Sequence, residues 1–471
     1  MSTRALGTRR QRLRRPLAAG PQKKMSVAMV DRMMWRTGFG PTNKTRASWT
    51  GKSVQAFVEF LLTTPQGGLR GDAPYREEGN PPVRNPLAPT EEDDDLVLEW
   101  CDRMIRLRNP FAERMALFFH NHFATQRNEV SPPQLMQSQI DLFRKFGDIA
   151  ANPAAKFSDM VAEVGEGPAM LRFLNGEENR KGRINENYGR EICELFALGI
   201  NDRKGNANYD EQTIIEISRA VSGWTIEDDD PNNVRAIFNE SRWDDEPKTV
   251  FGKTGNFKHR DIVNIVAGHW SHPYFICTKL WENFITVPCP KTTMDDLIRT
   301  YRKGGTRVRP VLQKILTDPL MFASFEPDMI KPPVVYVIGT MRALGRTITS
   351  NMVVNALDSQ GQTPYFPPTV AGWEGGFSWL NTNTSLSRFD FASNLIDDDN
   401  YEVAAPPKGE TNAQAFRTAH TAVGRPWMSP GTRSALLFWA KNAKAEQADD
   451  RIARQKVLRT FMIGGPDAQV M

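Results

Sequence analysis

Residues 185–224 decide the fold of this 471-residue chain, because they hold its clearest helical pattern. They read Asn-Glu-Asn-Tyr-Gly-Arg-Glu-Ile-Cys-Glu-Leu-Phe-Ala-Leu-Gly from 185 to 199, then a short polar loop, then Tyr-Asp-Glu-Gln-Thr-Ile-Ile-Glu-Ile-Ser-Arg-Ala-Val-Ser-Gly-Trp from 209 to 224. We expect two helices joined by a tight Gly/Asn turn, with Asp210 capping the second helix. At roughly 100° per residue, the first helix has an apolar face of Tyr188, Ile192, Leu195 and Phe196, and its opposite face gathers Asn187, Arg190, Glu191 and Glu194.

The first of these segments resembles the signature of a bacterial family catalogued as domain of unknown function 1800. The usual signature is Asn-Glu-Asn-Tyr-Ala-Arg-Glu, a Glu-Leu three residues on and a closing Leu-Gly. The chain matches it at Asn185, Glu186, Asn187, Tyr188, Arg190, Glu191, Glu194, Leu195, Leu198 and Gly199. Gly189 stands where the family usually has alanine. Blocks at 36–42, 115–123, 247–252 and 364–379 also resemble the family, so the resemblance covers about residues 25–471.

The rest of the chain predicts a mostly α-helical protein with little or no sheet. Apolar residues recur at helical spacing in segment after segment, whereas residues 65–95 and 364–379 are rich in Pro and Gly and predict long loops. Residues 228–246 are acidic and aromatic, which leaves open either a short strand pair or an ordered loop. No repeat or linker divides residues 25–471, so we expect one large multi-helix domain. The four cysteines are widely spaced and predict buried free thiols: Cys101, Cys193, Cys277 and Cys289.

The N-terminal residues 1–24 are strongly basic, with eight Arg or Lys residues and no acid. The formal net charge of +5 comes from this tail, since the rest of the chain has 52 basic and 55 acidic residues. We expect a disordered arm and no specific nucleic-acid site, because the folded body carries no excess of positive charge.

An export signal is a further interpretation of this tail. Residues 8–13, Thr-Arg-Arg-Gln-Arg-Leu, are similar to a twin-arginine motif, but the apolar run that follows is short and is broken by Pro16 and Pro21. Many members of the family look exported; this chain as written predicts retention in the cytoplasm. No apolar run is long enough for a transmembrane helix.

The polar face of the 185–199 helix is the first candidate site, and it has two interpretations. As structure, Arg190 and Glu194 are four residues apart and predict an ion pair within a network that ties neighbouring helices together. As a site, Glu191 and Glu194 predict a pocket where two carboxylates act as base and acid or bind a divalent metal, with Arg190 and Asn187 beside them.

His122 is the candidate partner of these carboxylates, both for catalysis and as a third metal ligand. It ends the helix that carries His120-Asn121-His122 and lies on that helix's apolar stripe. Residues two apart on a helix point away from each other, so His120 and His122 cannot share a ligand. A hydrogen-bonded core histidine is the structural alternative for His122.

The loop at 364–379 is the second candidate site. It reads Pro-Tyr-Phe-Pro-Pro-Thr-Val-Ala-Gly-Trp-Glu-Gly-Gly-Phe-Ser-Trp, and its Pro and Gly content excludes a helix. Trp373 and Trp379 predict either a binding surface or a loop pinned to the core by its aromatic rings. Asn381 and Arg388 follow and are candidate binding residues, as is Tyr188 of the signature helix.

Two functions fit these features. The first is a binding or assembly component that works with a partner protein; the resemblance implies a companion of the family of unknown function 1501, which is similar to alkaline phosphatases. The second is an enzyme, a metal-dependent hydrolase or oxidase that uses the Glu/Arg/Asn face of the 185–199 helix. Arg242-Trp243-Asp244 stands where the family usually has Arg-His-Asp, which argues against a mechanism that depends on that histidine.

Overall fold

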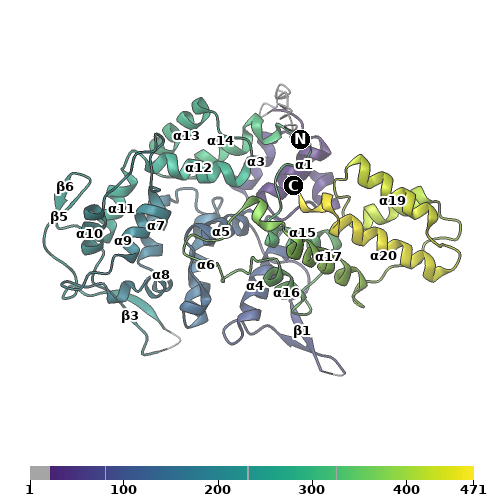
Figure 1. The fold of residues 1–471 in the computed structure, drawn as a ribbon, viewed down its shortest axis with the longest axis horizontal. Helices are drawn as coiled ribbons and strands as arrows, with labels where there is room; N and C mark the ends of the chain where they lie inside the picture. The colour runs from purple at the N-terminus through teal and green to yellow at the C-terminus, as the bar shows by residue number, and fades with distance from the viewer. Residues whose placement is uncertain (1–21, 80, 231–232, 325) are drawn as a thin grey trace, which may run out of the picture.

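The computed structural model describes residues 22–471 except 80, 231–232 and 325, and it shows a mostly α-helical protein (Figure 1). The described residues form twenty α-helices and three two-stranded antiparallel sheets, which confirms the predicted fold class. The predicted basic tail lies outside the described residues up to position 21. Its last two residues, Lys23 and Lys24, pair through the backbone with Val54 and Ser53.

The helices at the centre of the molecule surround α5 (Phe111–His122), which is buried on almost every side. α5 packs against α6 (Pro133–Gly147), and α4 (Asp93–Arg106) packs against both of them and against α15 (Pro333–Leu344). α6 begins with proline at its first position, where no backbone N–H is needed.

A second group of helices covers this centre on the side where the described chain begins (Figure 1). It comprises α1 (Val27–Thr37), α2 (Asn43–Trp49), α3 (Val54–Thr63), α12 (His272–Phe284), α13 (Lys291–Lys303) and α14 (Arg309–Thr317). α3 shows why these helices form: the Ser53 side chain caps its first turn, and Val54, Phe57, Val58 and Leu61 line its buried face at helical spacing.

The signature helices lie at one end of the molecule and the C-terminal helices at the other (Figure 1). The signature end contains α7 (Phe157–Gly165), α8 (Pro168–Phe173), α9 (Asn187–Glu191), α10 (Glu211–Ala220) and α11 (His259–Ala267). The C-terminal end contains α16 (Met352–Ser359), α17 (Thr382–Asp397), α18 (Asn412–Ala422), α19 (Pro430–Asn442) and α20 (Ala448–Gly464). No described helix is long and apolar enough to cross a membrane.

The three sheets are hairpins, and only the first, β1 with β2, lies in a region that the sequence predicts as a loop, residues 65–95. β1 (Tyr75–Glu78) pairs with β2 (Val83–Pro86), β3 (Trp224–Glu227) with β4 (Arg235–Phe238), and β5 (Lys248–Val250) with β6 (Lys253–Gly255). Residues 228–246, for which the sequence allows either a strand pair or an ordered loop, contain the strand β4.

The signature segment is helical, but it is not one continuous α-helix. α9 ends at Glu191, and the chain continues as a π-helix, Ile192–Ala197, in which the N–H of Leu198 bonds the carbonyl of Cys193 five residues back, at 3.2 Å. The prediction that one α-helical spacing holds throughout 185–199 is therefore wrong beyond Glu191. π-helical turns are rare in proteins, and those that occur often lie at functional sites. The second helix is shorter than the 209–224 pattern, and Asp210 caps it as expected by accepting from the Thr213 N–H at 2.8 Å.

The buried apolar side chains form a large core and a small one. The large core draws on helices from Met25 to Met471, and the small one lies among α17, α18, α19 and α20. α17 belongs to both, with Phe391 and Leu395 in the large core and Ala392 and Ile396 in the small one. The four cysteines are free, as the sequence predicts, and Cys101, Cys193 and Cys277 are buried; the prediction of burial is wrong for Cys289, which is only half-buried.

Candidate functional site

The polar face of the signature helix is an ion-pair network centred on Arg190. Its guanidinium lies 3.6 Å from Glu194, 3.2 Å from Glu186 and 2.8 Å from Glu211 on α10. The predicted pair with Glu194 is thus present, and the network joins α9 to α10. Asn187 is exposed and donates to the carbonyl of Leu174 at 3.3 Å, which holds the preceding turn.

Glu191 differs from the rest of this face because one of its oxygens is isolated. Its Oε2 is buried and accepts no hydrogen bond from a described residue. Burial, followed by repulsion from the Glu194 carboxylate, raises the pKa of Glu191 to about 7, against the opposing effect of Arg190. A carboxyl group with such a pKa exchanges its proton near neutrality, which suits a general acid or base.

Tyr188 is buried and begins a chain of hydrogen bonds through two residues that the sequence analysis does not identify, His259 and Glu166. Its hydroxyl donates to Nε2 of His259 at 2.8 Å, and Nδ1 of His259 donates to Oε1 of Glu166 at 3.2 Å. Arg260 also binds Glu166, at 2.6 Å and 2.9 Å. This carboxylate–imidazole–phenol chain joins α7, α9 and α11. Its members are separated by tens of residues, so no local pattern could have revealed it.

The residues His120-Asn121-His122 at the end of α5 hold two segments: residues 364–379, which we call the tryptophan loop, and the π-helix. The N–H of Tyr365 donates to Nε2 of His120 at 3.0 Å, and the N–H of Trp373 donates to the side chain of Asn121 at 2.7 Å. Nε2 of His122 donates to the carbonyl of Phe196 in the π-helix at 2.9 Å. The end of α5 therefore connects the tryptophan loop to the signature segment, and the two histidines do not share a ligand.

His122 is a neutral core histidine in this arrangement. Its Nδ1 accepts from Nζ of Lys279 on α12 at 3.2 Å, and burial holds the pKa of His122 well below its usual value. His272 makes the equivalent contact one residue on, since its Nδ1 donates to the carbonyl of Ala197 at 2.8 Å. The two histidines satisfy the last carbonyls of the π-helix, which lack helical partners.

A metal centre made of Glu191, Glu194 and His122 is not formed. Over residues 22–471 as described, no three or more His, Cys, Asp or Glu side chains are placed to hold a metal ion. His122 directs its ring nitrogens to Phe196 and Lys279, and Glu194 lies beside Arg190.

The tryptophan loop, residues 364–379, frames a cavity of about 500 Å³ against α5 and α12. Trp373 and Trp379 both line it and are only 6% and 7% exposed, whereas Phe377 between them is 88% exposed. The loop is therefore pinned by its indoles, as the second sequence interpretation has it, and it also borders a cavity; a role as a binding surface stays a prediction.

Asn381 and Arg388 lie outside this cavity. Asn381 is exposed and caps α17 through the Thr384 N–H at 2.9 Å. Arg388 is completely buried, and its guanidinium donates to the side chain of Gln469 at 3.0 Å and to the carbonyl of Lys331 at 2.9 Å.

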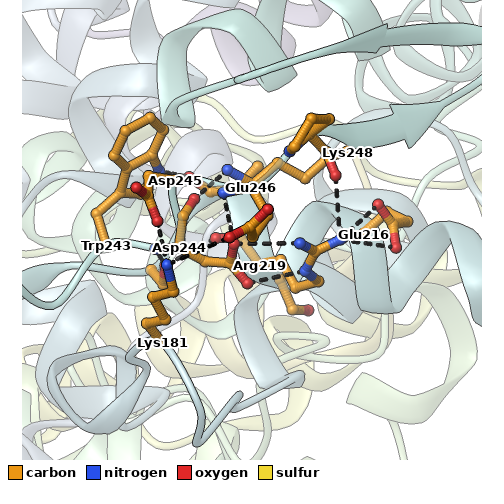
Figure 2. A network of polar contacts seen from close by, with 12 residues as sticks. Lys181, Glu216, Arg219, Trp243, Asp244, Asp245, Glu246 and Lys248 are labelled. Atoms are coloured by element: carbon orange, nitrogen blue, oxygen red, sulfur yellow. Dashed lines mark hydrogen bonds and ion pairs between the residues drawn. The ribbon is translucent and has the colours of Figure 1, made fainter.

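Trp243 and Asp244 of the Arg242-Trp243-Asp244 block belong to a polar network beside α10 and β5, which pack together (Figure 2). Arg219 on α10 donates to both oxygens of Asp244, at 2.8 Å and 3.1 Å. The Trp243 ring lies 4.4 Å from the Lys248 ammonium and 4.7 Å from that of Lys258. The Trp243 indole, which stands where the sequence resemblance implies a histidine, thus takes part in cation–π contacts.

Comparison with known proteins identifies a family. The model of the family described as "Protein of unknown function (DUF1800)" matches residues 32–470, nearly the whole chain. No curated protein and no solved structure matches the chain.

Proposed function

Because this chain belongs to the DUF1800 family of proteins of unknown function, we propose from its own geometry that it is a binding component that docks a partner protein through the tryptophan loop. The observation that carries the proposal is Phe377, whose side chain is 88% exposed while the indoles on either side are buried. Aromatic side chains dominate the binding energy of protein interfaces, and an exposed one at the tip of an anchored loop is suited to such a role.

The loop is held in place before any partner arrives. The backbone N–H groups of Tyr365 and Trp373 donate to His120 and Asn121, at 3.0 Å and 2.7 Å. A loop that is ordered in advance loses less conformational entropy on binding, which favours affinity. The partner that we propose is the companion of the family of unknown function 1501, the pairing that the family resemblance implies.

The test is a binding measurement between the purified protein and that companion by isothermal titration calorimetry. Phe377→Ala is expected to weaken binding by roughly tenfold or more, as truncation of an interface anchor does. The matched control is Phe438→Ala, because Phe438 on α19 is also highly exposed, at 72%, and lies at the C-terminal end of the molecule. Equal affinities of the two variants, or no binding by the unmodified protein, would contradict the proposal.

An enzyme is the second candidate, and the isolated oxygen of Glu191 favours it. In this proposal Glu191 exchanges the proton, the charge of Glu194 helps to raise its pKa, and Arg190 and Asn187 border the site. A metal-dependent hydrolase or oxidase would require a divalent ion at these carboxylates. Elemental analysis of the protein and of the Glu191→Gln/Glu194→Gln variant tests this form: stoichiometric metal that the variant loses would support it, and no metal in either would refute it.

A further inference from the structure

Arg114, on α5, is a buried cation without a partner. Its side chain is 5% exposed, and it forms no hydrogen bond or ion pair with any residue in the described part of the chain; its Nε is fully buried. Other buried arginines are compensated: Arg36 lies 2.6 Å from Asp328, and Arg388 donates to Gln469 and to the carbonyl of Lys331. A buried charge is costly unless a counter-charge or hydrogen-bond acceptors compensate it.

Arg114 lines the same cavity of about 500 Å³ as Trp373 and Trp379. Two further donors on its wall also lack acceptors among the described residues. Nδ2 of Asn283, on α12, is buried without a partner. The side-chain oxygen of Gln362 accepts from the Val334 N–H at 3.0 Å, which leaves its NH₂ group unused. Several unused donors in one cavity indicate a ligand that supplies acceptors.

The acidic residues on the cavity wall do not neutralise Arg114. Asp328 is held by Arg32 at 3.1 Å, by Arg36 at 2.6 Å and by the Thr286 hydroxyl at 2.8 Å. Glu282 is exposed and makes no ion pair with Arg114; partial burial of its carboxyl raises its pKa, against the attraction of Lys279. Burial lowers the pKa of Arg114 only to about 10, so the guanidinium stays charged at neutral pH.

We infer that this cavity binds a small molecule that carries a carboxylate or phosphate on an aromatic or apolar body. The oxyanion pairs with Arg114, whose planar guanidinium matches two oxygens at once. The body lies against the indoles and the apolar wall of Leu117, Phe118, Met329 and Ile330. The volume is within the ~300–1,000 Å³ usual for small-molecule sites. This inference stands on Arg114, whereas the docking proposal stands on Phe377, which also lines this cavity.

Titration of the intact protein, followed by tryptophan fluorescence and by its melting temperature, tests the inference. The probes are benzoate, phenyl phosphate, inorganic phosphate and, as the neutral match, benzyl alcohol. Benzoate or phenyl phosphate is expected to bind saturably and to raise the melting temperature, and benzyl alcohol to do so at least roughly tenfold more weakly, because it lacks the charge-assisted bonds. Binding by inorganic phosphate alone would show that the oxyanion suffices and would overturn the role of the aromatic body.

The variants Arg114→Met and Arg114→Lys locate the site. Arg114→Met is expected to abolish the anion response while leaving the melting temperature of the free protein unchanged or higher, because no carboxylate loses its partner. Arg114→Lys keeps the positive charge but loses the planar guanidinium that binds two oxygens at once, so this variant is expected to bind the anions with intermediate affinity.

Arg454→Met is the control, since Arg454 on α20 is buried to a similar extent but forms an ion pair with Glu410 at 2.7 Å. It should lower the melting temperature and leave anion binding intact. An anion response that survives in Arg114→Met, or the unfolding of both Arg114 variants, would overturn the inference.

Discussion

At the residue scale, Glu191 separates the structural and chemical interpretations of the signature helix. Arg190 and its three carboxylate partners are an ion-pair network at a partly exposed face, and such pairs contribute about 0–1 kcal/mol each. Glu191 takes no part in this network, and one of its oxygens is buried without a hydrogen bond from any residue that the structure describes. A group of this kind lowers stability when it is charged, because its buried oxygen lacks a hydrogen bond to offset the lost hydration.

We predict that Glu191 makes the protein less stable as the pH rises. The folded pKa, about 7, is above the usual value for Glu, so the folded state binds more protons between roughly pH 4.5 and 7 and loses stability across that window. Glu191→Gln should remove this loss and be more stable by about 1 kcal/mol at pH 8, a value reduced for solvent screening. Urea unfolding at pH 5 and pH 8 measures the difference.

Glu211→Gln is the control for this prediction. Glu211 also lies beside Arg190, but it is exposed, and the hydrogen bond from Arg190 lowers its pKa instead of raising it. This variant should keep the decrease in stability between pH 5 and pH 8. If Glu191→Gln shows the same decrease, the raised pKa of Glu191 is wrong.

At the scale of elements, the tryptophan loop depends on its close approach to the end of α5. Gly372 has φ +82°, and a Cβ at this position would lie 2.3 Å from the carbonyl oxygen of Asn121 and 2.4 Å from its side-chain oxygen. We predict that Gly372→Ala costs about 2–3 kcal/mol, because the loop must move away and the bond from the Trp373 N–H to Asn121 is lost.

Gly376→Ala in the same loop is the matched control for Gly372→Ala. Gly376 also has positive φ, +69°, but open space surrounds the position of its Cβ. Only the backbone conformation is penalised there, so we expect a cost of about 1 kcal/mol. Thermal unfolding of both variants gives the comparison, and equal costs would show that contact with Asn121 does not position the loop.

The packing of α9 on α10 depends on Gly189, the position where the family usually has alanine. A Cβ here would lie 2.1 Å from Oγ of Ser218 and 3.2 Å from the carbonyl of Ile214. We predict that Gly189→Ala destabilises the protein by about 1–3 kcal/mol and that Ser218→Ala, which removes the clashing oxygen, restores most of the loss. A double-mutant cycle measures the coupling; purely additive effects would show that the two helices separate freely.

At the scale of the whole molecule, the small C-terminal core is expected to open before the large one. It contains far fewer buried side chains and is connected to the large core mainly through α17, which contributes residues to both. A region with a small core has a lower opening free energy. Native-state hydrogen exchange should show α18 and α19 exchanging at lower denaturant than α5 and α15. A single common opening free energy would show that the two cores unfold together.

The sequence by itself determined the class of fold and the position of much of the helical structure. Apolar spacing is a local property, and it identified the helical segments. The Asp210 cap and the free cysteines followed from other features of the sequence, the residue type before the helix and the wide separation of the cysteines. The same spacing correctly separated His120 from His122, because the geometry of one helix depends on its own residues alone. Apolar spacing could not predict the π-helix after Glu191. The carbonyls that this helix leaves free are bound by His122 and His272, which are distant in the sequence.

Only the tertiary structure decided which polar residues meet. Arg190 and Glu194 are four residues apart, so their pair could be predicted. The contacts among Tyr188 on α9, His259 on α11 and Glu166 just after α7 could not be predicted, because these residues are far apart in the sequence. Arg114 has no local feature that distinguishes it from other arginines of the chain. Its isolation arises because α5, α12 and the tryptophan loop enclose it without placing a carboxylate beside it. Burial and charge balance depend on every neighbouring element at once, so they are properties of the folded chain.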